Sequence, residues 1–136
     1  MSEPFWVFGL TALAGGVGAA CRLLVDGAVS ALLTRRGGRP VLPWGTLAVN
    51  LSGSLLIGVV AGLLAGGMLS DVMRWGLAVG LLGGYTTFST ASFESVRLLR
   101  ERRWVAAVLH GPGQLAVATA LAWLGWWIGA GAPGVA

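Results

Sequence analysis

The side chains that could do chemistry are concentrated in one polar segment of an otherwise apolar stretch. The segment Gly80-Leu-Leu-Gly-Gly-Tyr-Thr-Thr-Phe-Ser-Thr90 holds four serine and threonine hydroxyls around Phe88, after a pair of adjacent glycines. Adjacent glycines and β-branched threonines both weaken a continuous helix. The carbonyls of a broken helix can bind a cation, and its free N–H groups and hydroxyls can bind an anion. We therefore predict an ion site at a helix break between Gly83 and Ser89; the alternative is that the hydroxyls bond back to their own helix.

Two more polar residues lie inside apolar stretches. Asn50 follows Gly45-Thr-Leu-Ala-Val, and a buried amide is costly unless it is hydrogen-bonded. Asn50 is thus either a link between two helices or a residue of the site. Arg22 follows the glycine-rich stretch Gly15-Gly-Val-Gly-Ala-Ala-Cys21. It either extends to the lipid headgroups or attracts anions in a water-filled vestibule.

Groups suited to enzyme chemistry are few. The chain has five acids, one histidine, one cysteine and no lysine, and no cluster has metal-ligand spacing or forms a Ser/His/Asp set. A lone histidine such as His110, near the start of the last predicted helix, is more often a packed polar residue than a ligand. We expect a protein that is not an enzyme.

The elements that hold these residues are expected to be membrane helices. Apolar residues make up 56% of the 136 residues and charged residues 10%, against about a quarter charged in a soluble domain. A helix that crosses the hydrocarbon core needs roughly 20 apolar residues. Ser70 is a candidate N-cap for the third helix. We predict a single all-α membrane domain, residues 1-136, with four transmembrane helices, the third broken at mid-membrane: about 4-33, 43-66, 71-99 and 103-129.

Three segments together resemble the Fluc/CrcB family of small fluoride channels. Gly80-x-x-Gly-Gly-x-Thr-Thr-Phe-Ser-Thr90 is similar to the family's signature in its third helix. Gly45-Thr-Leu-x-Val-Asn50-x-x-Gly53 and the glycine-rich approach to Arg22 match in the same order. The resemblance implies a fluoride-selective channel subunit for passive export of fluoride from the cytoplasm. It also implies assembly of two four-helix subunits as an antiparallel dimer in the cell membrane.

The resemblance further implies which residues form the site. A structural sodium ion at the dimer centre would be held by the backbone carbonyls of Gly83 and Thr86. Phe88 would offer its positive ring edge to fluoride, with Asn50 as a donor beside it. The polar side of the pore would be formed by Ser89, Thr90 and Glu94. Its aqueous mouth would be formed by Arg22.

Two positions depart from the family pattern. The family usually has a second phenylalanine three residues after the first, where this chain has Ala91. In the fourth helix the family carries tyrosine, serine or threonine, where this chain has His110-Gly-Pro-Gly-Gln114; Pro112 predicts a kink or a late helix start. These departures keep open an alternative, a partner subunit that supports a pore without conducting. A small dual-topology multidrug exporter is disfavoured. That mechanism needs an ionisable carboxylate within the membrane, typically in the first helix, and here no acid lies between Glu3 and Asp26.

The arginines are unevenly distributed over the two ends of the predicted bundle. Basic loops are retained in the cytoplasm, so they set topology and do not indicate nucleic acid as a partner. We expect one orientation, with both termini outside the cell. An antiparallel dimer then needs a second homologous subunit with the opposite bias, so a heterodimer is favoured over a homodimer. One end carries only Arg74, and the other carries Arg22, Arg35, Arg36, Arg39, Arg97, Arg100, Arg102 and Arg103.

Overall fold

Helices make up most of the described parts of the chain, residues 4–34 and 41–131, in the computed structural model. Two of them, η1 and η2, are π-helical stretches that continue from their neighbours. In chain order the helices are α1 (Phe5–Thr34), α2 (Trp44–Ala65), α3 (Asp71–Met73), η1 (Arg74–Leu82), α4 (Gly83–Tyr85), α5 (Phe88–Arg100), α6 (Trp104–Val108), η2 (Leu109–Gly113) and α7 (Gln114–Ala130).

These elements form four helical spans, which confirms the predicted all-α membrane fold of four helices. Within the described ranges, three helices are long and apolar enough to cross a membrane, judged by length and composition: Phe5–Leu33, Trp44–Ala65 and Trp104–Ala130. The remaining span, from α3 to α5, is divided by two extended residues, so neither of its parts has that length on its own.

Local signals set the ends of the third and fourth spans. The Ser70 hydroxyl accepts a hydrogen bond from the Met73 N–H at 3.4 Å, as expected of an N-cap. The fourth span begins at Trp104, before Pro112, so the proline does not delay the helix start. Pro112 lies inside η2 instead. Such π-helical turns are a known way to accommodate an irregularity inside a helix.

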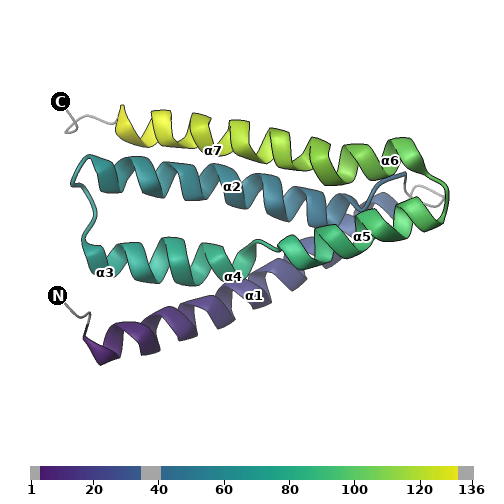
Figure 1. Ribbon diagram of the computed structural model, residues 1–136. Helices are drawn as coiled ribbons and strands as arrows, with labels where there is room; N and C mark the ends of the chain where they lie inside the picture. Colours follow the sequence, from purple (N-terminus) through teal and green to yellow (C-terminus); the bar gives the residue numbers. More distant parts are fainter. Residues whose placement is uncertain (1–3, 35–40, 132–136) are drawn as a thin grey trace.

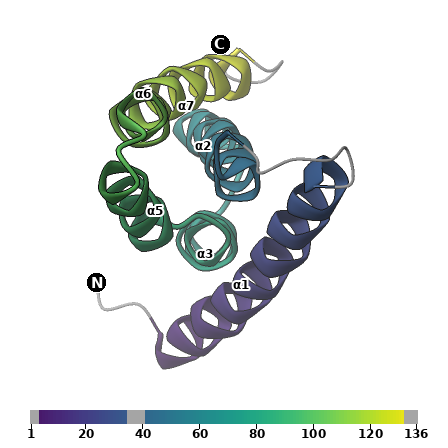
Figure 2. The ribbon, with the colours of Figure 1, turned by 90° about the vertical axis from the view of Figure 1, so that its right-hand side faces the viewer.

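The spans run alternately up and down, which places the connections at two ends (Figure 1). The start of α1, the link between α2 and α3, and the end of α7 lie at one end; the turn between α5 and α6 lies at the other. α2 packs chiefly against α7, and α1 packs chiefly against η1 and also against α2 and α4. Seen from the end of the α5–α6 turn, α7 lies on the far side of α2 from α1 (Figure 2). α2 is therefore the central helix.

Glycines bring the backbones of α2 and α7 into direct contact. A Cβ atom added to Gly58 would lie 2.0 Å from the Ala122 carbonyl oxygen. A Cβ atom on Gly125 would lie 2.2 Å from the Leu55 carbonyl oxygen. Both neighbours are backbone atoms, so they cannot rotate away. Close packing of this kind replaces the hydrophobic effect as the force between membrane helices.

Gly58→Ala is therefore expected to destabilise the protein. The added methyl group must push α2 and α7 apart, and overpacking of this kind costs about 1–3 kcal/mol. The measurement is the thermal midpoint of the purified protein in detergent. Gly9→Ala is the matched control, because a Cβ atom there has no neighbour within 4 Å. Equal thermal midpoints for the two variants would contradict the prediction.

Candidate functional site

The third span is interrupted at Thr86 and Thr87. Their backbones are extended, with φ −78° and ψ 159° at Thr86 and φ −147° and ψ 121° at Thr87. Helix α5 begins at Phe88 with Thr87 as its N-cap, since the Thr87 hydroxyl accepts from the Thr90 N–H at 3.3 Å. The polar segment singled out in the sequence thus contains two extended residues between two helices, where the sequence predicted a break.

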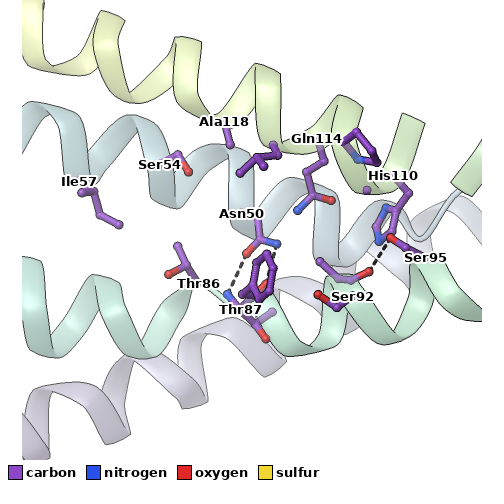
Figure 3. A pocket seen from close by; sticks show the side chains of 15 residues that line it. Asn50, Ser54, Ile57, Thr86, Thr87, Ser92, Ser95, His110, Gln114 and Ala118 are labelled. Carbon is purple, nitrogen blue, oxygen red and sulfur yellow. Dashed lines mark hydrogen bonds between the residues drawn. The ribbon is translucent and has the colours of Figure 1, made fainter. Parts of the chain in front are cut away.

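Asn50 joins α2 to this interruption through both ends of its amide. Its Nδ2 donates to the Thr87 carbonyl at 2.8 Å, and its Oδ1 accepts from the Thr87 N–H at 2.8 Å (Figure 3). Both residues are buried, with 8% of each exposed. An amide carries two N–H donors, so one Asn50 N–H is not used by this pair. Asn50 thus links two helices, and the link lies at the break.

The interruption removes the regular helical donors of the carbonyl groups just before it, those of Gly83 and Thr86 among them. In a continuous helix the Thr87 N–H would donate to the Gly83 carbonyl and the Thr90 N–H to the Thr86 carbonyl. Here the first donates to Asn50 and the second to the Thr87 hydroxyl. No group of three His, Cys, Asp or Glu residues in the described ranges could hold a metal ion. The groups that the break offers to a cation are backbone carbonyl and threonine hydroxyl oxygens.

A cavity of about 550 Å³ lies beside the break, between α2, α5, η2 and α7 (Figure 3). Asn50 and Thr87 line one part of it. Ala91 also lines it and is buried, so its methyl group leaves the space that a larger ring at this position would fill.

Phe88, Ser89 and Thr90 gather on the first turn of α5. Phe88 contributes to the cavity and is 80% exposed in the single chain. The Thr87 hydroxyl lies 3.4 Å from the Ser89 hydroxyl and 3.0 Å from the Thr90 hydroxyl. The structure therefore brings these hydroxyls together around Thr87, a residue that the sequence analysis did not place in the site. Its position directly before Phe88, inside the same motif, was the available signal.

Arg22 lies in a second, smaller cavity of about 160 Å³. Asp26, Thr46 and Thr90 line it as well. Thr87 lines both cavities and thus separates them. A chain of polar groups therefore runs from Arg22, past the break, to the larger cavity. Arginine and hydroxyl groups are suited to attract and bind an anion.

Glu94 is the remaining predicted residue, and it pairs with a group from the fourth span. Its Oε2 lies 3.1 Å from Nε2 of His110, which is fully buried. The sequence predicted a packed polar histidine, and burial confirms this, but its carboxylate partner lies 16 residues away and was not predicted. Gln114, one turn after His110, also lines the larger cavity. The i, i+4 spacing of the two polar residues was the available signal.

Comparison with known proteins gives one family. The sequence matches the family described as CrcB-like protein, Camphor Resistance (CrcB), over residues 9–126. It is 45% identical over 119 residues to the Fluoride-specific ion channel FluC 1 of Leifsonia xyli subsp. xyli, covering 87% of this chain and 82% of that protein. It is 40% identical over 115 residues to the Fluoride-specific ion channel FluC of Geobacter sulfurreducens, covering 84% of this chain and 89% of that protein. It is also 40% identical over 127 residues to the Fluoride-specific ion channel FluC 1 of Symbiobacterium thermophilum, covering 93% of this chain and 98% of that protein.

Proposed function

Because the chain belongs to the CrcB-like protein family, we propose that it is a subunit of a fluoride-selective channel that exports fluoride passively from the cytoplasm. Its curated relatives are named as fluoride-specific ion channels. A channel needs no catalytic group, so the protein is not an enzyme. The observation that carries the proposal is the position of Thr87, held by Asn50 between two cavities.

The proposed path replaces the water around fluoride by fixed donors. Fluoride holds its hydration shell tightly, so a conducting path has to offer donors at each step. Arg22 attracts the anion at the aqueous mouth, and the Ser89 and Thr90 hydroxyls, with Glu94 beyond them, form the polar side of the pore. Asn50 offers the N–H that Thr87 leaves unused, and Phe88 offers the positive edge of its ring.

We also propose a structural sodium ion at the dimer centre, held by the carbonyls of Gly83 and Thr86. The fit rests on the hydrogen bonds at the break, because both carbonyls lack their helical donors. Carbonyl oxygens of irregular backbone are suitable ligands for an alkali cation at membrane depth. When bound, sodium would supply a fixed positive charge and tie the breaks of two subunits together.

The proposed assembly is an antiparallel dimer in the plasma membrane, with the break of each third helix at mid-membrane. The described residues of the α5–α6 end include Arg97, Arg100, Arg102 and Arg103, and Arg74 lies toward the other end (Figure 1). Arg35, Arg36 and Arg39 lie outside the described residues. This bias supports a single orientation with both termini outside, and so a second homologous subunit of opposite orientation. A homodimer remains the other arrangement.

A second candidate function is that of a partner subunit that supports the pore without conducting through its own residues. It is favoured by Ala91, which lines the larger cavity without an aromatic ring. In a heterodimer the other subunit would supply the second phenylalanine of the family pattern. The two candidates differ in whether substitutions in the proposed path of this chain stop the release of fluoride through the channel.

Phe88→Ile in the assembled channel separates these candidates. The parental channel is expected to release fluoride, and not chloride, from loaded liposomes, as followed with ion-selective electrodes. Phe88→Ile is expected to abolish the release, because isoleucine has no positive ring edge. Phe93→Ile is the matched control, since Phe93 is also exposed on α5 and lines neither cavity. Parental release by Phe88→Ile would favour the supporting subunit, and no release by the parent would overturn both candidates.

A further inference from the structure

The smaller cavity contains a carboxylate beside the arginine of the proposed mouth. Its volume is about 160 Å³, and Arg22, Asp26, Thr46 and Thr90 are among the residues that line it. Arg22 and Asp26 are four residues apart on α1, so their side chains lie on the same face of the helix, about one turn from each other. The family resemblance assigns Arg22 to the aqueous mouth and does not include Asp26. One positive and one negative side chain therefore share the space where fluoride would enter.

A buried hydroxyl indicates that this cavity is wet. Thr46 is 2% exposed, and its Oγ1 forms no hydrogen bond within the protein. Buried polar atoms are rarely left unpaired, so water or an ion in the cavity is the partner that this hydroxyl needs. The volume has room for about five water molecules of about 30 Å³ each. Fluoride can therefore enter this cavity with part of its hydration shell, before it reaches Thr87.

The carboxylate of Asp26 is held against the first turn of α2. A Cβ atom added to Gly45 would lie 2.7 Å from the Asp26 carbonyl oxygen and closer still to Asp26 Oδ1. The Ser30 hydroxyl donates to the same Oδ1 at 3.4 Å. The N-cap of α2 is Pro43, which makes no side-chain cap hydrogen bond, so a nearby carboxylate can complement the positive end of this helix. Asp26 thus lies close to both positive features of the cavity, Arg22 and the start of α2.

A negative charge at this place opposes the entry of an anion. A cavity of this volume is narrower than the Debye length of about 8 Å at physiological ionic strength, so a fluoride ion inside it interacts with both Arg22 and Asp26. A cleft lined by charges opposite to those of a ligand raises the association rate by about 10- to 1,000-fold. The carboxylate cancels most of this attraction.

We propose that Asp26 limits the rate at which fluoride enters the path of this chain, by neutralising the positive charge of Arg22 and of the start of α2. The inference rests on the proposed channel function and adds to it a residue that sets its rate. Asp26 does not bind fluoride and acts only through the electric field at the mouth. The same neutrality lets the anion move on, because conduction requires that an ion is bound weakly enough to leave.

A purely structural role for Asp26 gives a different result. If the carboxylate only stabilised the start of α2, its loss would lower the thermal midpoint of the protein. Fluoride efflux would then stay the same or become slower. A faster efflux after loss of the charge, sensitive to ionic strength, is therefore the result that a structural role does not produce.

The test measures fluoride release by the assembled channel from liposomes that contain about 10 mM fluoride. At this ionic strength the Debye length is about 30 Å, so charges at the mouth are screened little. Asp26→Asn keeps the shape of the side chain and is expected to release fluoride about threefold to tenfold faster than the parental channel. With about 1 M potassium isethionate on both sides, the Debye length falls to about 3 Å, and the two rates should converge.

Asp71→Asn is the matched control. It removes the same charge from the same chain, but Asp71 pairs with Arg74 at 3.5 Å on the surface and lines neither cavity. We expect the parental rate from this variant at both ionic strengths. Asp26→Ser is a second neutral variant and should show the same gain as Asp26→Asn, so that the result does not depend on the assembly of one protein.

The outcomes separate this inference from the channel proposal. Release at or below the parental rate by the neutral variants of Asp26 would overturn the inference while leaving the channel function intact. A gain that persists at high ionic strength, or an equal gain in Asp71→Asn, would do the same. Failure of both neutral variants to assemble would assign Asp26 to the fold and overturn the inference as well. Absence of release by the parental channel would instead refute the channel function.

Discussion

Asn50→Ala is expected to abolish fluoride efflux while the subunits still assemble. The substitution removes both hydrogen bonds to Thr87 and the N–H donor proposed to contact fluoride. Fluoride then lacks a donor in the buried path, and an unpaired buried group costs about 1–3 kcal/mol, which corresponds to a loss of up to about 100-fold in rate. The Thr87 N–H would also be free to donate to the Gly83 carbonyl. That bond would restore regular helix and remove the proposed ion site, while the close contact of α2 with α7 at Gly58 and Gly125 stays intact.

The experiment compares efflux and assembly for the same variant. Efflux is measured from liposomes with a fluoride electrode, and assembly by size-exclusion chromatography. Ser54→Ala is the matched control, since Ser54 lies one turn further along α2, lines the same cavity and lacks the bonds to Thr87. We expect parental efflux for Ser54→Ala. Efflux at the parental rate by Asn50→Ala would show that the path through Thr87 is wrong.

The chain expressed alone is expected to yield no fluoride efflux and to insert in a single orientation. Setting Arg22 aside as a site residue, seven arginines lie at one predicted end and one at the other, and such a bias retains the basic end in the cytoplasm. Two copies with the same orientation cannot form an antiparallel pair. Efflux should appear when a homologous subunit of opposite arginine bias is produced in the same cell.

Terminal tags and efflux decide this prediction together. Tags at both termini should be accessible only from outside, and fluoride release should require both genes. Robust efflux from the single gene, with each tag found on both sides of the membrane, would establish a dual-topology homodimer. Efflux from the single gene with tags on one side only would contradict the antiparallel arrangement itself.

Several features of the fold could be predicted because they depend on residues close together in the chain. Long apolar runs separated by arginines indicate membrane helices, since each crossing must satisfy its own backbone in lipid. The Ser70 cap is likewise a local effect, in which a hydroxyl accepts from an N–H three residues on. The glycine pair Gly83-Gly84 and the threonines that follow indicated where continuous helix is weakest.

Other features were decided by packing between segments that are distant in the chain. Gly18 has no side chain, and the fold brings the Leu81 backbone against it, with the Leu81 carbonyl oxygen 2.0 Å from where a Cβ atom would lie. In the same way, Pro112 predicted an irregular helix, but its position inside η2, after five residues of regular α6, follows from the packed structure. Neither the neighbour of Gly18 nor the position of the irregular turn around Pro112 can be read from sequence spacing.

The sequence by itself determined the membrane class, the four helices, the weak point of the third and the family to which the chain belongs. Only the tertiary structure decided that Asn50 bonds to Thr87, 37 residues away, and that His110 bonds to Glu94. The physical reason is the range of the interactions. Helix propensity, capping and hydropathy depend on neighbours within a few residues, whereas a buried amide or imidazole takes whichever partner the packed helices bring within hydrogen-bonding distance.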